Sequence, residues 1–588
     1  MKYPIIPVAQ SLILSCINFK FFDIVISPGS RNVPLAIGFS SNNKFKCYSV
    51  VDERSAAFFA LGLSQKSKKP TVLICTSGSA LLNYYPAVAE AYYSEIPLII
   101  LSADRPKYKI NIGDGQTINQ SDVFEKNILY SNSLNQDCIH ATEEIIKSNS
   151  QNIIDIKVDN SRLEKLQKSI QVKNEKIIEK AFNLSLNKMQ PVHLNVPMEE
   201  PLYDFFSKPS IKVKVLKKSE KARVDTNFSN HYSQISKAKK ILILIGASDK
   251  GLLSKKSIDK INSKSSMVVL KEHTSNIDED SFISNIDRLI GPIELKANSD
   301  SLFEDLSPEI IISIGGMIIS KKVKTFLRNY KSRMHIHIGN NISKDSFYNG
   351  VEHVKASPDK FFENIEAKKI ESDYRKIWQN IDNKNLEFHN RYLKVTNFSD
   401  LKVFEILTNR IPKKYEIHVA NSTPIRYFQL FDLKNNNIMF ANRGTSGIEG
   451  STSTAIGSSV NSDSPVTLIT GDLSFFYDVN ALWNKHIPSS FRIIIINNSG
   501  GGIFKILPGY KEDDLFSEFI VTKHDLSARS IAKMFNFHYT KVSSKFGLNF
   551  ALRTFFKNSK KPKILEIKTS GMKSTKILKD YFRYLSKS

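Results

Sequence analysis

Short apolar runs alternate with amphipathic segments along the whole chain, and the runs have the length of buried β-strands. Small and apolar residues at positions 55–63, between the second and third runs, predict a helix. This alternation predicts an α/β fold built from doubly wound parallel sheets. The predicted strands are residues 22–27, 48–51, 71–75, 98–101 and 192–196, then 241–245, 267–270, 310–314 and 335–338, and finally 416–420, 438–441, 466–469, 492–496 and 564–567.

Polar segments between these groups of strands predict three domains. Residues 202–230 contain Lys-Lys pairs and are interpreted as a linker, and residues 371–393 form a charged helical segment before the third group. We therefore place the domains at residues 1–198, 205–370 and 395–588 of the 588-residue chain. Domains of about 100–200 residues are typical of chains of this length.

The first 22 residues contain an apolar run that Gln10, Ser11 and Ser15 interrupt, which predicts an amphipathic helix. They lack the basic segment and cleavage site of a signal peptide, and no apolar run approaches the roughly 20 residues needed to cross a bilayer. The four cysteines form no Cys-x-x-Cys pair and sit mostly in apolar surroundings, which favours buried thiols in a reducing compartment. They are Cys16, Cys47, Cys75 and Cys138. We expect a cytoplasmic protein.

The chain is basic, with a net charge of +25 and a pI near 9.5. Such a charge could attract nucleic acid or an anionic membrane surface. The lysines are scattered as singles and pairs, however, which favours ordinary surface charge. Since no recognition helix or set of stacking aromatics is apparent, we expect neither nucleic acid nor a membrane as partner.

A carboxylate and an amide follow two predicted strands in the third region. Asp472 comes directly after one strand, and Asn498 follows the next strand 26 positions later. Carboxyl ends of neighbouring parallel strands form the ligand-binding edge of an open α/β sheet. Oxygen ligands of this kind suit Mg²⁺ completed by substrate phosphates, and Gly500, Gly501 and Gly502 would let the backbone approach them. Alternatively, Asp472 caps a helix and Asn-Ser-Gly forms a turn.

Two further features have both a functional and a structural interpretation. Gly246 and the pair Gly315-Gly316 follow strands of the second region, but neither completes a G-x-G-x-x-G motif, so structural turns are favoured over a nucleotide site. Glu53 lies between a strand and a helix among apolar neighbours, where burial would raise its pKa. It could equally favour the helix N-terminus electrostatically.

Several motifs together point to one family. Gly-Asp followed about 26 residues later by Asn-Asn resembles the diphosphate-binding signature of thiamine-diphosphate enzymes, although Leu473 stands where Gly is common. More specific motifs resemble the menaquinone-pathway synthases of 2-succinyl-5-enolpyruvyl-6-hydroxy-3-cyclohexene-1-carboxylate. They are Ser-Pro-Gly-Ser-Arg at 27–31, Asp-Glu-Arg-Ser-Ala-Ala-Phe-Phe-Ala-Leu-Gly-Leu at 52–63, Cys-Thr-Ser-Gly-Ser at 75–79, Asn-Tyr-Tyr-Pro-Ala-Val at 83–88, Ala-Asp-Arg-Pro at 103–106, Gly-Gln-Thr-Ile-Asn-Gln at 115–120, Asn-Arg-Gly-Thr-Ser-Gly-Ile-Glu-Gly at 442–450 and Gly-Asp-Leu-Ser at 471–474.

The resemblance implies a transferase that decarboxylates 2-oxoglutarate on thiamine diphosphate and adds the resulting succinyl carbanion to isochorismate, in menaquinone or phylloquinone biosynthesis. Asp472, Asn498 and the Gly500 carbonyl would bind Mg²⁺, with Mn²⁺ as an alternative, and Glu53 would be catalytic by hydrogen-bonding N1′ of the cofactor. Further cofactor contacts implied are Ser79, Ser446, Ile448, Leu473, Ser474, Gly500, Gly501 and Ile503. Substrate contacts implied are Ser30, Arg31, Arg105, Gln116, Lys321, Lys322, Ser422, Arg426, Arg443, Phe504 and Leu507.

Departures and alternatives accompany this resemblance. Gly115 stands where the family usually has Asn, and Lys322 where it often has Arg. For each arginine the alternative interpretation is a surface ion pair. The family implies a homodimer, or a tetramer of two such dimers, with sites built across subunits. Other thiamine enzymes, such as acetolactate synthases or simple 2-oxo-acid decarboxylases, share the cofactor signature, and a basic nucleic-acid-binding protein is the non-enzyme alternative.

Overall fold

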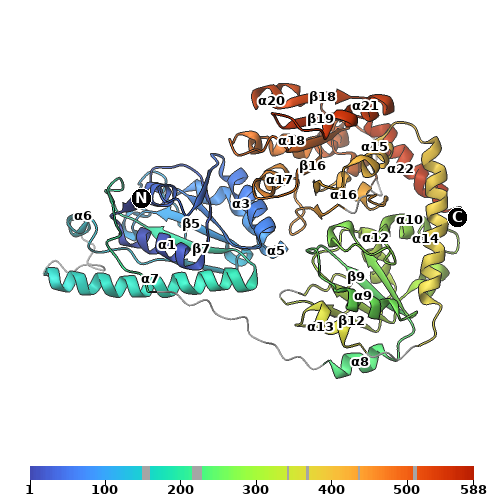
Figure 1. The fold of residues 1–588 in the computed structure, drawn as a ribbon, viewed down its shortest axis with the longest axis horizontal. Coiled ribbons are helices and arrows are strands. Elements are labelled where there is room, and N and C mark those ends of the chain that lie inside the picture. Colours follow the sequence, from blue (N-terminus) through green and yellow to red (C-terminus); the bar gives the residue numbers. More distant parts are fainter. Residues whose placement is uncertain (149–158, 215–227, 341–342, 366–369, 435–436, 507–512) are drawn as a thin grey trace. The chain divides into compact units, whose positions relative to one another are not determined.

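The computed structural model describes residues 1–148, 159–214, 228–340, 343–365, 370–434, 437–506 and 513–588 (Figure 1). Three parallel sheets with helices between their strands confirm the expected α/β fold class. A two-stranded antiparallel sheet pairs β1 (Tyr3–Pro4) with β8 (Phe205–Phe206). The chain forms two compact units. Residues 215–227 of the predicted linker and Leu507 lie outside the described residues.

The first unit comprises Met1–Lys221, Gly444–Asp463 and Asp478–Pro488, and it contains a six-stranded parallel sheet in the order β3-β2-β4-β5-β7-β6. Every residue of the central strands β4 and β5 is buried, as expected where helices cover both faces of a parallel sheet. The strands are β2 (Asp23–Ile26), β3 (Lys46–Ser49), β4 (Thr71–Cys75), β5 (Leu98–Asp104), β6 (Tyr130–Ser133) and β7 (Val192–Pro197).

The first helix is not amphipathic, in contrast to the prediction. α1 (Pro7–Phe19) packs beside the long helix α7 (Asn160–Lys188), and its polar residues Gln10, Ser11 and Ser15 are buried (Figure 1). The Gln10 amide donates hydrogen bonds of 2.8 Å to the Pro4 carbonyl and to Ser210 Oγ. Other segments of the chain therefore cover the polar positions that suggested a solvent-facing side.

Two helices of the first unit cross at very short range. An added Cβ at Gly62 in α3 (Glu53–Ser67) would lie 2.0 Å from the Thr454 carbonyl of α17 (Ser451–Val460). Reciprocally, an added Cβ at Gly457 would lie 2.0 Å from the Phe59 carbonyl. No side chain fits such a gap, so the glycines of both helices are there for packing. This crossing fixes the segment that begins at Gly444 against the helix that begins at Glu53.

The second unit comprises Ala222–Arg443, Ser464–Tyr477 and Ser489–Ser588. Its first sheet has five parallel strands in the order β10-β9-β11-β12-β13, and its second has six in the order β15-β14-β16-β17-β19-β18. The strands are β9 (Ile241–Ile245), β10 (Met267–Lys271), β11 (Ile310–Ile314), β12 (Met334–Ile338), β13 (Glu352–Val354), β14 (Glu416–Val419), β15 (Met439–Phe440), β16 (Val466–Gly471), β17 (Arg492–Asn497), β18 (His538–Val542) and β19 (Lys563–Lys568).

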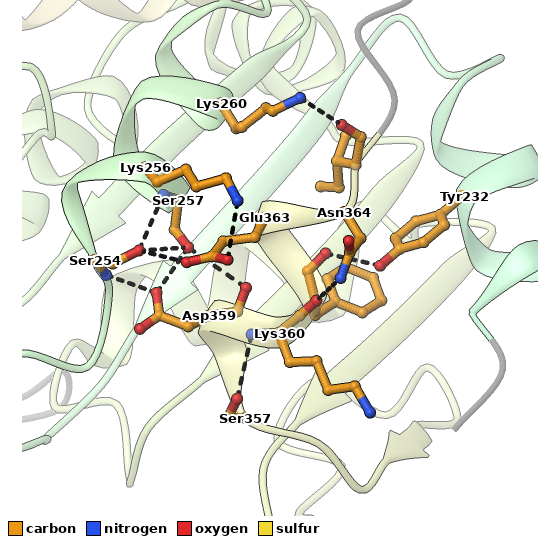
Figure 2. Close-up of polar contacts among 12 residues, drawn as sticks. Tyr232, Ser254, Lys256, Ser257, Lys260, Ser357, Asp359, Lys360, Glu363 and Asn364 are labelled. Carbon is orange, nitrogen blue, oxygen red and sulfur yellow. Dashed lines mark hydrogen bonds and ion pairs between the residues drawn. The ribbon is translucent and has the colours of Figure 1, made fainter. Parts of the chain in front are cut away.

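Side-chain carboxylates join two helices that pack against one face of the five-stranded sheet. Asp359, in α13 (Pro358–Glu363), accepts hydrogen bonds from the Ser254 N–H at 2.6 Å and from Ser257 Oγ at 2.7 Å (Figure 2). Glu363 of the same helix accepts one from Ser254 Oγ at 3.1 Å. These bonds join α13 to the first turn of α9 (Lys255–Asn262), where backbone N–H groups need acceptors.

A buried arginine of the second unit forms ion pairs with residues of two other segments. Arg288 lies in α10 (Ile286–Ile293) and is 2% exposed. Its guanidinium pairs with Asp382 at 3.2 Å, in α14 (Tyr374–Val395), and with Asp432 at 3.1 Å. A charge buried this deeply needs both partners to offset its lost hydration.

The cysteines agree with the expectation of buried, unpaired thiols. All four cysteines are free, and Cys16, Cys75 and Cys138 are buried. Burial raises the pKa of the Cys138 thiol to about 11, so this group is a neutral thiol near neutral pH. Within the described ranges, none of the helices combines the length and apolar character needed to cross a membrane.

Candidate active site

The carboxyl edge of β16 and β17 brings the predicted metal ligands together. The strands are parallel neighbours, with Gly471 paired to Ile496, so Asp472 and Asn498 emerge at the same edge. Asp472 begins α18 (Asp472–Tyr477) and is 3% exposed. Its carboxylate accepts from the Leu473 N–H at 2.8 Å and from the Gly500 N–H at 3.0 Å. Burial raises the pKa of this carboxyl, and these N–H groups and His524 oppose that shift.

Asn498 has its amide oriented by a residue that the sequence did not indicate. Asn498 Nδ2 donates to Asp400 Oδ2 at 2.9 Å. Asp400, at the start of α15 (Asp400–Arg410), is 2% exposed. Because this carboxylate takes the nitrogen end of the amide, the oxygen end of Asn498 is the one left to bind a cation.

The turn after Asn498 adopts conformations that require glycine. Gly500 has φ +133°, and an added Cβ there would lie 2.7 Å from the Val521 carbonyl. The Gly501 N–H donates to the same carbonyl at 2.6 Å. Next to Asp472, by contrast, an added Cβ on Gly471 would meet no atom within 4 Å in the described part of the chain. The edge therefore combines oxygen ligands with room for a group beside them, which fits Mg²⁺ and the diphosphate it accompanies.

His524 also lies at this edge, and no sequence motif indicated it. Its Nε2 lies 3.4 Å from Asp472 Oδ2, within ion-pair distance but outside hydrogen-bond geometry. Nδ1 accepts from the Leu526 N–H at 3.1 Å, and Phe476 packs edge-on against the ring. The imidazole is thereby held against the carboxylate, 26 residues after Asn498 and with no spacing signal in between.

Glu53 lies in the first unit, at the start of α3. Its neighbour Asp52 performs the capping role, because the Asp52 carboxylate accepts from the Ser55 N–H at 3.1 Å. Burial raises the pKa of the half-buried Glu53 carboxyl, and Asp52 raises it further. Asp52 therefore provides the helix cap, Glu53 is the acidic residue of the first turn, and burial favours the protonated form of Glu53.

Two of the predicted arginines lie close together in the first unit. Arg105 Nη1 donates to Ser77 Oγ at 2.7 Å and to the Gln116 carbonyl at 3.0 Å. Burial lowers the pKa of Arg105, and the charge of Arg31 lowers it further. Arg31 itself pairs with Glu200 at 2.8 Å, as the ion-pair alternative anticipated, but its own side chain is buried.

A cavity of about 830 Å³ opens beside Ser30 and Arg31. The Glu199 and Glu200 side chains also line it, together with Lys109. Lys109 Nζ pairs with Glu199 at 2.7 Å.

Three other predicted site residues of the first unit are exposed. Ser79 lies at the start of α4 (Ser79–Asn83), and Gly115 and Gln116 lie on a loop. An added Cβ at Gly115 would meet no described atom within 4 Å.

Ser446 and Ile448 belong to the first unit, in the segment that begins at Gly444. Glu90, which is 1% exposed, holds this segment by accepting from the Gly444 and Thr445 N–H groups, each at 2.7 Å. Ser446 has φ +64°, and Ile448 is 36% exposed. A large apolar side chain held outward by a fixed loop has the form expected of a cofactor-supporting wedge.

The remaining predicted substrate residues lie in the second unit around buried carboxylates. Glu272 accepts from the Ile319 and Ser320 N–H groups at 2.7 and 2.8 Å, just before α12 (Lys321–Asn329). Lys321 is exposed at the first position of that helix, and Lys322 pairs with Glu294. Arg443 Nη1 donates to Asn421 Oδ1 at 2.7 Å.

Lys324 is a basic residue of this region that the motifs did not indicate. Burial lowers its pKa, the charges of Arg443 and Arg426 lower it further, and Glu272 opposes them. Arg426 lies in α16 (Thr423–Phe428), which begins after Ser422 with φ +71°. Arg426 Nε is buried and has no hydrogen-bond partner among the described residues. Lys324 and Arg443 thus lie near Glu272, while Arg426 lies near a second buried carboxylate, Asp287.

Ile503 and Phe504 follow the Gly500 turn and are half-buried in the short helix Gly502–Ile506.

Taken together, the predicted site residues form two groups. One group, around Glu53 and Arg105, lies in the first unit, and the other, around Asp472 and Arg443, lies in the second.

Comparison with known proteins identifies the family. The family model described as the N-terminal TPP binding domain of thiamine pyrophosphate enzymes matches residues 7–125. The 2-succinyl-5-enolpyruvyl-6-hydroxy-3-cyclohexene-1-carboxylate synthases of Christiangramia forsetii and Flavobacterium psychrophilum are each 44% identical to the chain, over 100% of either chain. The synthase of Bacteroides fragilis is 34% identical over 96% of both chains. This chain belongs to the same synthase family. It is a thiamine-diphosphate-dependent enzyme, and the resemblance found in its motifs is confirmed.

Proposed function

We propose that this member of the synthase family decarboxylates 2-oxoglutarate and joins the remaining succinyl unit to isochorismate, forming 2-succinyl-5-enolpyruvyl-6-hydroxy-3-cyclohexene-1-carboxylate for menaquinone or phylloquinone biosynthesis. The observation that carries the proposal is the oxygen-ligand edge of Asp472, Asn498 and Gly500 in a chain related to such synthases along its full length. Mg²⁺, or Mn²⁺ in its place, would bind there and bridge to the cofactor diphosphate.

Thiamine diphosphate, when bound, supplies the carbon nucleophile and the electron sink that decarboxylation of a 2-oxo acid requires. Glu53 would hold a proton at N1′ of its aminopyrimidine, and burial, by raising the pKa of this carboxyl, favours the protonated form. Ile448 would support the bent cofactor, and Ser79, Ser446, Leu473, Ser474, Gly501 and Ile503 would line its two ends.

Cationic side chains would bind the carboxylates of both substrates. Arginine forks match carboxylates in geometry and charge. The pair Arg31 and Arg105 in the first unit and the pair Arg426 and Arg443 in the second are each gathered by the fold. Ser30, Gln116, Lys321, Lys322 and Ser422 would add polar contacts, and Phe504 and Leu507 an apolar wall.

A product assay tests this function. The purified protein is incubated with thiamine diphosphate, Mg²⁺, isochorismate and 2-oxoglutarate labelled with ¹³C at C1, and the mixture is followed by mass spectrometry. We expect labelled CO₂ and a product whose mass equals both substrates less CO₂. Labelled CO₂ without a joined product would indicate a simple decarboxylase, and turnover of pyruvate by a flavin-containing yellow protein would indicate an acetolactate synthase.

A pair of variants separates the role of Glu53 from helix capping. Glu53→Gln removes the acidic proton and should abolish turnover while leaving the fold intact. Asp52→Asn keeps an equally good helix cap and should retain most of the activity. If both variants lost activity equally, Glu53 would have no role beyond that of its neighbour.

We further propose that the enzyme is a cytoplasmic homodimer, or a tetramer of two such dimers, with domains at 1–198, 205–370 and 395–588 and with each site shared between two subunits. Glu53→Gln and Asp472→Ala should each be inactive alone. In verified heterodimers of the two variants, one site carries both defects and the other carries neither, so activity should return toward half of the wild-type value. Heterodimers without activity would contradict shared sites.

A further inference from the structure

Asp400 is held more rigidly than a surface carboxylate at a helix start. Its Oδ1 accepts from Thr569 Oγ1 at 2.5 Å, its Oδ2 accepts from Asn498 Nδ2 at 2.9 Å, and its backbone N–H donates to Ser574 Oγ at 3.0 Å. Thr569 directly follows β19, and its own N–H donates to the Asn497 carbonyl at 3.0 Å. The carboxylate is therefore fixed to the same strand ends that form the ligand edge. Burial raises its pKa, and the hydrogen bonds from Thr569 and Asn498 oppose the shift.

The chemistry of an amide explains why this anchor matters. The two ends of the Asn498 side chain are similar in shape, but only the oxygen can bind a cation. A carboxylate accepts hydrogen bonds and donates none when it is ionised, so it attracts the NH₂ end. With Asp400 on one side, the amide oxygen must point the opposite way. An apolar neighbour at position 400 would leave both orientations open.

We propose that Asp400 is a positioning residue that orients the Asn498 amide, so that its oxygen is presented to the divalent cation. This inference rests on the proposed metal site at Asp472 and Asn498. Residues that orient metal ligands through one hydrogen bond typically change metal affinity by roughly 10- to 100-fold when they are removed. A change of that size, without a change in which ligands bind, is the expected signature.

The test is a calorimetric titration of Mg²⁺ into the full-length protein at saturating thiamine diphosphate, and it measures affinity instead of turnover. Asp400→Ala should weaken Mg²⁺ binding about 10- to 100-fold. Asp400→Asn keeps an oxygen that can accept from Asn498 and should weaken it less. It also keeps the side-chain size, so it carries the test if Asp400→Ala does not fold. Asp359→Ala is the matched control, because it removes a carboxylate that fastens a helix start away from this edge (Figure 2).

A double-mutant cycle separates positioning from general destabilisation. In an Asn498→Ala background there is no amide left to orient, so Asp400→Ala should cause less than a twofold further loss of Mg²⁺ affinity. Full additivity, or an unchanged affinity in Asp400→Ala alone, would overturn the inference. Failure of the proposed metal site is distinguishable, because then Asn498→Ala itself would leave the Mg²⁺ affinity of the wild type unchanged.

Discussion

The second unit contains two sheets whose strands end in glycine turns, and the turns differ in how closely the glycines are packed. At the five-stranded sheet, the Gly246 N–H donates to the Ile314 carbonyl at 3.0 Å and the Gly316 N–H to the Ala247 carbonyl at 2.7 Å. An added Cβ on Gly246 would lie 2.1 Å from the Gly316 carbonyl. The glycines there let two turns pack against each other, which supports their interpretation as structural turns.

At the β16–β17 edge the glycines serve a different purpose. Gly471 borders open space, Asp472 presents a carboxylate beside it, and Asp400 leaves the oxygen of Asn498 for a ligand. A carboxylate also lies at the first edge, and Glu272 accepts from backbone N–H groups with both oxygens, as Asp472 does. A glycine after a strand therefore indicates a ligand site only where it borders open space, as Gly471 does and Gly246 does not.

The Asp472→Ala variant should have the largest effect on ligand binding at the β16–β17 edge. The diphosphate would lose its bridging cation, so thiamine-diphosphate affinity should fall at least about a thousandfold, equivalent to roughly 4 kcal/mol. Stability should fall by about 1–3 kcal/mol, because the buried Gly500 N–H loses its acceptor. Isothermal titration of the cofactor in the presence of Mg²⁺ measures the effect. An unchanged cofactor affinity would make the two edges equivalent.

Glu272→Gln tests the purely structural role of the other carboxylate. Burial raises the pKa of Glu272 to about 7 from an ordinary value of 4.5. The folded chain then holds a proton more tightly than the unfolded chain, so this group stabilises the fold fully below pH 4.5 and loses that contribution as the pH rises through about 7. Gln removes this dependence. Relative to the variant, the wild type should lose up to roughly 3 kcal/mol of unfolding free energy between pH 4.5 and 8.

Trp378 offers a local probe for that measurement. It is buried in the second unit, whereas the other tryptophan, Trp483, is exposed. Urea unfolding followed by fluorescence in a Trp483→Phe background reports on the unit that contains Glu272. Glu304→Gln, which removes an exposed carboxylate from the same region, is the control for charge alone. Parallel pH profiles of wild type and Glu272→Gln would contradict the assignment.

Gly246→Ala should destabilise the chain without affecting the ligand edge. The new Cβ would clash with a backbone carbonyl that cannot move freely, and overpacking of this kind typically costs about 1–3 kcal/mol. Thermal unfolding should show the loss, while the folded variant keeps wild-type affinity for Mg²⁺ and cofactor. Loss of cofactor affinity in a stably folded variant would indicate a ligand role for this turn.

Gly471→Ala is the complementary change and should have the smallest effect on stability. Its Cβ would meet no described atom within 4 Å, and its backbone is not in the left-handed region. We expect the free energy of unfolding to remain within about 0.5 kcal/mol of wild type, as for ordinary surface changes. A large destabilisation measured by the same thermal unfolding would mean that this edge is as closed as the other.

Apolar strands were predictable, including the edge strand β10, whereas polar edge strands were not. Residues 71–75, 241–245 and 310–314 are largely apolar and form strands with the predicted bounds. β3 lies at Lys46–Ser49 instead of 48–51, because an edge strand has a single neighbour and its position follows the pairing of Asp23 with Lys46. β18, also at an edge, is mostly exposed and polar, and it gave no apolar signal.

The residues of the candidate site also differ in whether the sequence could indicate them. Residues carried by local motifs, such as Asp472 with Asn498 and Glu53 with Asp52, were predictable because their spacing or their neighbours belong to the motif. Asp400 and His524 reach the β16–β17 edge from distant parts of the chain. Each is a single polar residue outside the motifs, and only the fold brings it there.

The most direct test of the metal edge is electron paramagnetic resonance of Mn²⁺ bound in place of Mg²⁺, with pulsed detection of ³¹P nuclei. In the wild type with thiamine diphosphate, we expect one tightly bound Mn²⁺ per chain with ³¹P coupling from the diphosphate, and in Asp472→Ala we expect neither. The same bound signal and ³¹P coupling in Asp472→Ala would contradict the assignment of this edge as the site of the cofactor and its metal.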